Sequence, residues 1–89
     1  MSRLEEKLIE LGYRKTKTVY FAQNEIPYIF YEKEYCCRAD ICIILYDDKI
    51  EDYYVESDYI RFSKQQALNN LQQAFNEMQK DLEVLKEYE

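Results

Sequence analysis

The stretch ADICIILYDDKIEDYYVE, residues 39–56, decides the fold because it reads as two strands joined by a short polar turn. Apolar side chains alternate from Ala39 to Leu45, so one face of the first strand is apolar. The DDK tripeptide that follows has the composition of a hairpin turn. We therefore predict a β-hairpin with strands over Ala39–Tyr46 and Ile50–Glu56.

Two more strands are expected before this hairpin. The segments TVYFAQ, Thr18–Gln23, and YIFYEKEY, Tyr28–Tyr35, both have a period close to two. Pro27 lies between them and restricts Ile26, so residues 24–27 are expected to form the turn. The sequence thus predicts an antiparallel meander of four strands.

A short helix is expected at the N-terminal end. Ser2 and Glu5 form a capping box, and leucines spaced for one helical face follow as far as Leu11. Gly12 stands where a residue in the left-handed conformation ends a helix. This helix is predicted over about Ser2–Leu11.

The C-terminal end carries a longer helical pattern. Ser63 and Gln66 form a second capping box, and a helix is predicted over about Lys64–Tyr88. Such a helix is ~37 Å long, whereas a short strand spans only ~20 Å, so the helix should extend beyond the sheet. Its apolar residues are spaced three and four apart: Leu68, Leu71, Phe75, Met78, Leu82 and Leu85.

The predicted fold is a single α+β domain over residues 1–89, in the order α-β-β-β-β-α, with an antiparallel meander covered on one face by both helices. The leucine-rich stripe of the long helix has two interpretations. It forms the core face of a helix packed on a sheet, or it forms a dimer seam. The residues of the seam would be Leu71, Met78, Leu82 and Leu85.

The charge of the chain excludes several classes of partner. The net charge is −6, and residues 21–60 hold ten acids but only three cations. Direct binding to nucleic acid or to an anionic membrane surface is disfavoured, because both depend on clustered cations. We expect no leader segment, since the sequence shows no long apolar run, and the cysteines Cys36, Cys37 and Cys42 are odd in number. We expect a protein of the reducing cytoplasm.

The sequence also argues against catalysis and cofactor binding. It contains no histidine, no C-x-x-C pair and a single glycine, which cannot build a phosphate-binding loop. The acids of the hairpin should be well hydrated, which keeps their pKa values unsuited to general-acid work. We expect a protein that is not an enzyme, with no catalytic residue, no metal and no cofactor.

The segment YDDKIEDYYVESDY, residues 46–59, is the candidate partner-binding site. A row of acids with interleaved aromatics either docks on a basic protein or is a solvated hairpin that discourages aggregation. Adjacent tyrosines on one strand point to opposite faces, so at least one of Tyr53 and Tyr54 should lie in the core. The candidate residues are Asp47, Asp48, Glu51, Asp52, Glu56 and Asp58, with Tyr53, Tyr54 and Tyr59 as aromatic anchors.

The whole pattern resembles a group of small proteins. LEEKLIELGY at the start, the DDKIEDYYV hairpin and NLQQAFNEMQKDLEVLKEY at the end are similar to small acidic early-region proteins of phages and prophages of low-GC Gram-positive bacteria. The resemblance carries no site residues. It implies a protein that binds and inhibits host machinery, such as a restriction or CRISPR effector that itself binds nucleic acid. The alternative is a structural homo-oligomer, a dimer formed through the long helix or a sheet face.

Overall fold

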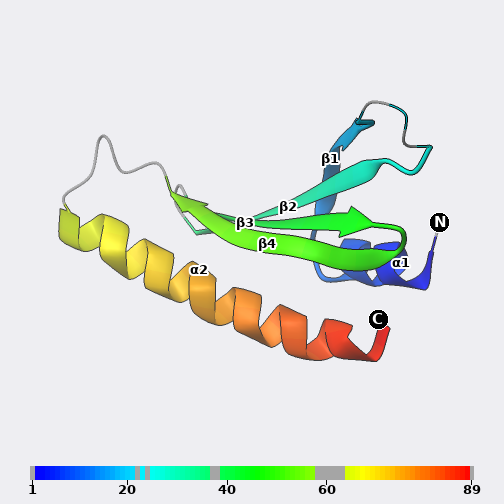
Figure 1. The fold of residues 1–89 in the computed structure, drawn as a ribbon. Coiled ribbons are helices and arrows are strands. Elements are labelled where there is room, and N and C mark those ends of the chain that lie inside the picture. The colour runs from blue at the N-terminus through cyan, green and yellow to red at the C-terminus, as the bar shows by residue number, and fades with distance from the viewer. Residues whose placement is uncertain (1, 22, 24, 37–38, 58–63, 89) are drawn as a thin grey trace.

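The computed structural model describes residues 2–21, 23, 25–36, 39–57 and 64–88. Figure 1 shows a short N-terminal helix, one open sheet and a long C-terminal helix, which confirms the predicted α+β order. None of the described helices is long and apolar enough to cross a membrane. The elements are α1 (Arg3–Glu10), β1 (Arg14–Val19), β2 (Tyr28–Cys36), β3 (Ala39–Tyr46), β4 (Lys49–Ser57), α2 (Lys64–Leu85) and a final 3-10 turn (Lys86–Tyr88).

The sheet is the predicted meander. Its strands lie in the order β1-β2-β3-β4, and each pairs antiparallel with its neighbour in sequence. The turn between β3 and β4 is Asp47-Asp48, and both residues have positive φ, 53° and 61°. Two consecutive left-handed residues form the tight hairpin turn whose twist matches the flanking strands, and aspartate tolerates that conformation better than most side chains.

The prediction for the first strand was wrong in position. The strand was expected over Thr18–Gln23, but β1 spans Arg14–Val19 and pairs with β2 from Glu32 back to Tyr28. The apolar run that suggested the later strand continues past the end of β1, where Phe21 is more than half exposed. The paired part of β1 is exposed because it is an edge strand, so its own sequence carries no clear alternation.

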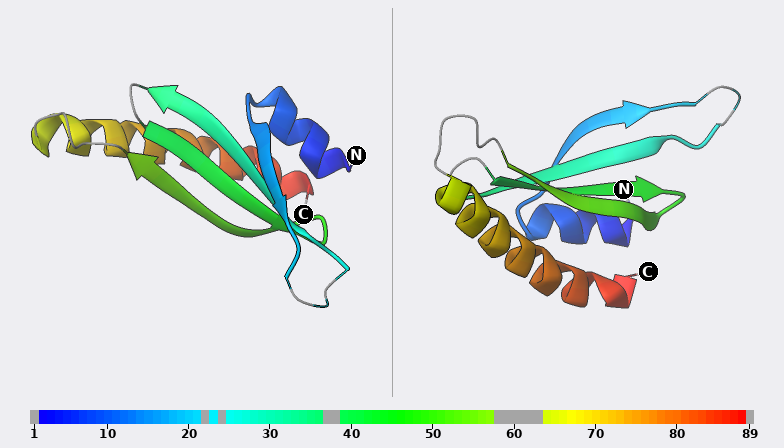
Figure 2. Two further views of the ribbon diagram at one scale, coloured as in Figure 1. Left: turned by 90° about the horizontal axis from the view of Figure 1, so that it is seen from above. Right: turned by 60° about the vertical axis from the view of Figure 1, so that its left-hand side comes forward.

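Both helices pack on the same face of the sheet, and the two views of Figure 2 show the opposite face without a covering helix. The core therefore lies in one layer between the sheet and the helices. Burying each of its larger apolar side chains contributes about 1.5–3 kcal/mol. Its members are Leu4 and Leu8 of α1, Tyr13, Tyr31 of β2, Ala39, Ile41, Ile43 and Leu45 of β3, and Ala74, Met78 and Leu85 of α2.

The ends of α1 follow their capping signals. The hydroxyl oxygen of Ser2 accepts a hydrogen bond of 3.2 Å from the backbone N–H of Glu5. Gly12 has φ 102°, which an L side chain rarely adopts, and it ends the helix as predicted. The chain then turns into β1 with Tyr13 pointing into the core.

The buried face of α2 is rotated from the leucine stripe. Ala74, Met78, Asp81 and Leu85 are buried, whereas Phe75 is 47% exposed and Leu68 is 51% exposed. The first turns of α2 extend past the strands, as its length predicts (Figure 1). Of the four residues proposed for a dimer seam, Met78 and Leu85 lie in the core of the single chain, and Leu71 and Leu82 are partly buried. The four therefore do not form one exposed stripe.

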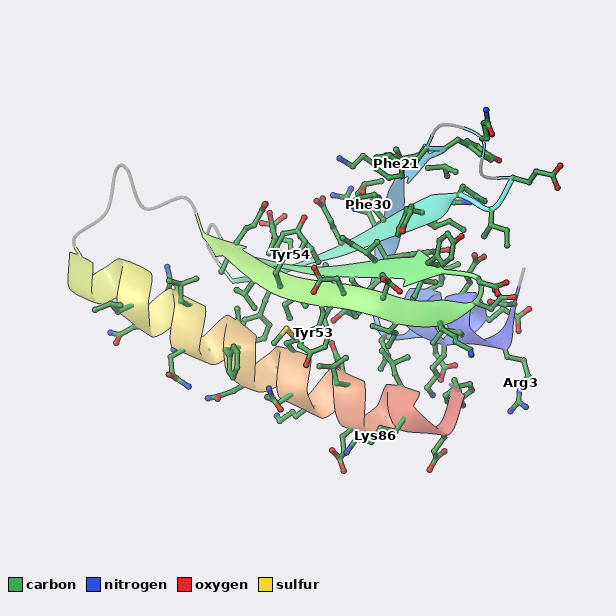
Figure 3. The ribbon with its side chains drawn as sticks, in the orientation of Figure 1. Arg3, Phe21, Phe30, Tyr53, Tyr54 and Lys86 are labelled. Atoms are coloured by element: carbon green, nitrogen blue, oxygen red, sulfur yellow. The ribbon has the colours of Figure 1, made fainter. Side chains whose placement is uncertain are left out.

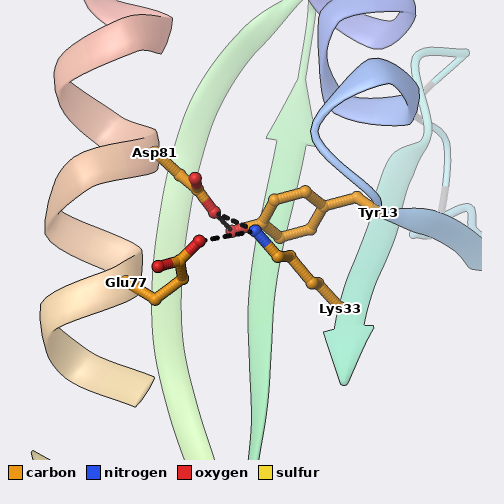
Figure 4. A network of polar contacts seen from close by, with 4 residues as sticks. All are labelled: Tyr13, Lys33, Glu77 and Asp81. Atoms are coloured by element: carbon orange, nitrogen blue, oxygen red, sulfur yellow. Dashed lines mark hydrogen bonds and ion pairs between the residues drawn. The ribbon is translucent and has the colours of Figure 1, made fainter. Parts of the chain in front are cut away.

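A polar network joins three parts of the fold (Figure 4). The hydroxyl of Tyr13 donates to Asp81 Oδ2 at 2.7 Å, and the Lys33 ammonium donates to the same oxygen at 2.9 Å. Lys33 also donates to Glu77 Oε1 at 3.2 Å. Asp81 is only 4% exposed, so this carboxylate depends on its two donors to offset the cost of burial.

Candidate functional site

The open face is the side of the sheet that the described helices leave uncovered (Figure 2). The strand register arranges its side chains in rows that run across β2, β3 and β4. One end of this face is aromatic, and the other end is acidic. The rows are Tyr28, Tyr46 and Lys49; Phe30, Ile44 and Asp52; Glu32, Cys42 and Tyr54; and Glu34, Asp40 and Glu56.

The acidic cluster consists of Glu32, Glu34, Asp40 and Glu56, which surround Cys42. Burial raises the pKa of Asp40, and the negative charges of Glu32 and Glu34 raise it further, while Arg14 of β1 lowers it. Carboxylates on neighbouring strands are close enough to repel one another. A cation placed over this cluster would relieve that repulsion.

Cys42 lies in the middle of the cluster but is almost completely buried. Burial raises the pKa of its thiol to about 12, and its Sγ donates a weak hydrogen bond of 3.6 Å to Glu32 Oε1. A neutral thiol is a poor nucleophile. Ligand atoms of Glu32, Cys42 and Glu56 lie within 4.8 Å of one another, so these three residues could hold a metal ion only if the thiol lost its proton.

The aromatic end of the open face contains a hollow of about 410 Å³. The rings of Phe21 and Tyr28 meet edge to face with centroids 5.2 Å apart, and Tyr28 also packs on Tyr46. Figure 3 shows Phe21 and Phe30 on the same side of the sheet as Tyr54. This aromatic hollow is lined by Phe21, Tyr28, Phe30, Ile44, Glu51 and Asp52.

A bulge in β4 helps to place two acids at the rim of the hollow. Leu45 pairs with Ile50 but Ile44 pairs with Asp52, so Glu51 is an extra residue between these pairs. The extra residue shifts the alternation of β4 and allows Glu51 and Asp52 to line the same hollow. The carboxylate of Asp52 also accepts a hydrogen bond of 2.8 Å from the backbone N–H of Tyr53.

The residues predicted for partner binding are not all on one surface. Asp52, Tyr54 and Glu56 lie on the open face and Glu51 at its rim, whereas Asp47 and Asp48 are exposed at the tip of the hairpin. Asp58 and Tyr59 lie outside the described residues.

Tyr53 and Tyr54 do point to opposite sides of the sheet, Tyr53 toward α2 and Tyr54 toward the open face (Figure 3). The expectation that one of them belongs to the core was wrong. Tyr53 is 46% exposed because β4 is an edge strand, and Tyr54 is only partly buried. Burial raises the pKa of the Tyr54 hydroxyl to about 12.

Several residues of the open face were missing from the predicted site. Glu32, Glu34 and Asp40 lie outside the acid-rich segment, yet strand pairing brings them beside Glu56. The signal was present in YIFYEKEY, whose alternate residues Tyr28, Phe30, Glu32 and Glu34 form one face of β2. Counting acids along the chain overlooks a cluster that is assembled across three strands.

Comparison with protein-family models, with curated proteins and with solved structures gives no match for this chain.

Proposed function

We propose that this protein is a non-enzymatic binding protein whose open face docks on a basic surface of another protein. In the phage setting that the sequence resemblance implies, the partner is a host defence protein that binds nucleic acid. The acids would occupy the cation sites that otherwise hold phosphates, and the partner would be inhibited by competition.

The observation that carries this proposal is the acidic cluster, in which three strands contribute carboxylates to one uncovered surface. Side chains on one face are ~7 Å apart along a strand and ~5 Å apart between strands, so the charges form a dense two-dimensional array. Such an array steers a basic partner and accelerates association at low ionic strength. The clustering costs folding stability, which favours a role in binding.

The chemistry of the same face supports binding over catalysis. The chain has no histidine, and the raised pKa of Cys42 keeps its thiol protonated at neutral pH. The acids of the cluster lie on a face that the described helices leave uncovered, where a partner can reach them.

A pull-down with charge-reversed variants tests the proposal. The tagged protein is incubated with lysate of a low-GC Gram-positive bacterium, treated with nuclease, at two salt concentrations, and bound proteins are identified by mass spectrometry. We expect one dominant basic partner that is lost at high salt. Glu34→Lys combined with Glu56→Lys should abolish its capture, since both side chains are exposed on the open face.

The matched control is Glu6→Lys combined with Glu87→Lys. It changes the net charge by the same amount as the first double variant, but at two exposed positions in the helices. It should leave capture unchanged. If both double variants weaken capture to the same degree, only the net charge matters and the open face is not the docking surface.

A structural homodimer is the second candidate. The observation that favours it is the exposure of Leu68 and Phe75 on α2, which gives the helix an exposed apolar strip beside its buried face. Light scattering at increasing concentration should then show a dimer that Phe75→Glu converts to a monomer. A monomer at every concentration would rule out this candidate.

A further inference from the structure

We propose that the aromatic hollow is an arginine-binding pocket that receives one arginine side chain from an extended basic segment of the partner. This inference rests on the proposed function and names the anchor of the interaction. The acidic cluster would attract the partner, and the hollow would fix its register.

The lining of the hollow matches the parts of an arginine side chain. Phe21, Tyr28 and Phe30 present aromatic rings, and Ile44 supplies an apolar wall for the methylene stem. Glu51 and Asp52 complete the lining, so two acidic residues lie at this end of the open face. A guanidinium group stacks on aromatic rings and forms forked hydrogen bonds with carboxylates, whereas an ammonium group does neither as well.

The protein already places a cation against this surface. Lys17 of β1 holds its ammonium nitrogen 4.4 Å from the centroid of the Phe30 ring, within the range of a cation–π interaction. Lys17 is exposed, so its side chain is able to move aside for a larger cation. This contact shows that the Phe30 ring, one wall of the hollow, accepts a cation.

The position of the hollow on the sheet predicts the spacing of the partner's cations. Along β3, Ile44 in the hollow is two residues from Cys42 and four residues from Asp40, in the acidic cluster. These steps correspond to ~7 and ~13 Å, which an extended segment matches with its alternate side chains. The preferred partner segment therefore has the pattern Arg-x-Lys-x-Lys, or its reverse, with arginine in the hollow.

Two capped peptides of equal charge test this inference, Arg-Ser-Lys-Ser-Lys and Lys-Ser-Lys-Ser-Lys. Their dissociation constants are measured by NMR titration of the ¹⁵N-labelled protein at low salt. We expect the arginine peptide to bind roughly fivefold more tightly, the scale of one cation–π and hydrogen-bonded contact. Shifts of backbone amides around Phe30 and Ile44 should distinguish it from the lysine peptide.

Two pairs of variants locate the effect. Phe21→Ala should remove the preference for arginine, whereas Phe75→Ala, which truncates a similarly exposed phenylalanine on α2, should keep it. Asp52→Asn should weaken the arginine peptide, whereas Asp47→Asn at the hairpin tip should not.

Equal affinities for the two peptides, or equal effects of Phe21→Ala and Phe75→Ala, would overturn the inference. Spermidine binding as tightly as the arginine peptide would overturn it too, and so would self-association that Phe21→Ala abolishes. The proposed function fails separately if the double variant Glu34→Lys with Glu56→Lys still captures the partner from lysate. The proposed function stands without the arginine-binding pocket if that double variant abolishes capture of the partner while Phe21→Ala leaves the capture unchanged.

Discussion

The two faces of the sheet come from the same strands, yet one is an apolar face buried under the helices and the other is an uncovered face with clustered acids. On the covered face, Ile41 and Ile43 of β3 are sealed under the helices, and the buried Asp81 has its hydrogen-bond donors. On the open face, acids of neighbouring strands lie beside one another, and the pKa of Asp40 is raised by burial and by those acids. One face is arranged for stability, whereas the other keeps an unfavourable charge pattern, as functional surfaces often do.

The largest effect on stability should come from truncating Leu85 in the core under the covered face. This side chain is fully buried, so Leu85→Ala should lower the free energy of unfolding by about 2–5 kcal/mol in urea denaturation. Val84→Ala, one residue away and 40% exposed, is the control and should cost less than about 1 kcal/mol. Similar costs for both variants would mean that α2 does not pack as described.

The next effect should come from the polar network. Asp81→Asn leaves the partly buried Lys33 with Glu77 as its remaining carboxylate partner and should cost about 3 kcal/mol. Replacing Lys33 with methionine in the same chain should recover part of that loss, because the partly buried cation that has lost the Asp81 carboxylate is then removed as well. Urea denaturation of the single and double variants measures the coupling, and strictly additive losses would contradict it.

Alkaline pH should lower the free energy of unfolding through two groups of the open face. Burial raises the pKa of the Cys42 thiol from 9.0 to about 12 and that of Tyr54 from 10.0 to about 12. Because the folded pKa values lie above the unfolded ones, folding favours the protonated groups. Their contribution is complete below about pH 9 and is lost as the pH rises toward 12.

Urea denaturation from pH 7 to pH 11 checks this, with Cys42→Ala as the comparison. The difference in unfolding free energy between the wild-type protein and the variant should be constant below about pH 9 and shrink above it. A difference that stays constant at every pH would show that the thiol titrates normally in the folded protein.

The smallest effect should have the opposite sign. Glu34 lies directly opposite Asp40 on the neighbouring strand, and like charges in that position destabilise a sheet. Glu34→Gln should therefore raise the free energy of unfolding by about 0.5 kcal/mol, while weakening capture of the basic partner. Glu83→Gln, which removes an exposed acid paired with Lys86 on the helical side, should bring no gain in stability.

Sequence reasoning was reliable where one local signal decides the structure. The turn at Asp47-Asp48, predicted one residue too long, the Ser2 cap of α1 and the start of α2 at Lys64 all follow from neighbouring residues. The predicted end of α2 at Tyr88 was three residues too late, because the last turn is a 3-10 turn. Sequence reasoning was unreliable where the partner strand or the core decides. Thus the prediction placed β1 too late in the chain, on an exposed apolar run. Nothing in the sequence of α2 itself indicates that Asp81 is buried.

The candidate site was only partly predictable for the same reason. Asp52 and Glu56 were identified from the acid-rich segment, but Glu32 and Asp40 join them only through the strand register. The hollow depends on Phe21, a residue beyond the end of β1, and on the bulge that shifts Glu51. Neither the bulge nor the position of that loop residue follows from alternation alone.

The hydrogen bond between Tyr13 and Asp81 joins residues that are 68 positions apart, whereas each strand pairs with its neighbour in sequence. Folding should therefore begin with the local hairpins, because they close short loops, and finish when α2 docks. Substitutions on the docking face of α2, such as Leu85→Ala, should then mainly accelerate unfolding and leave the folding rate nearly unchanged. The lifetime of the folded protein would be set by how tightly this last helix is held.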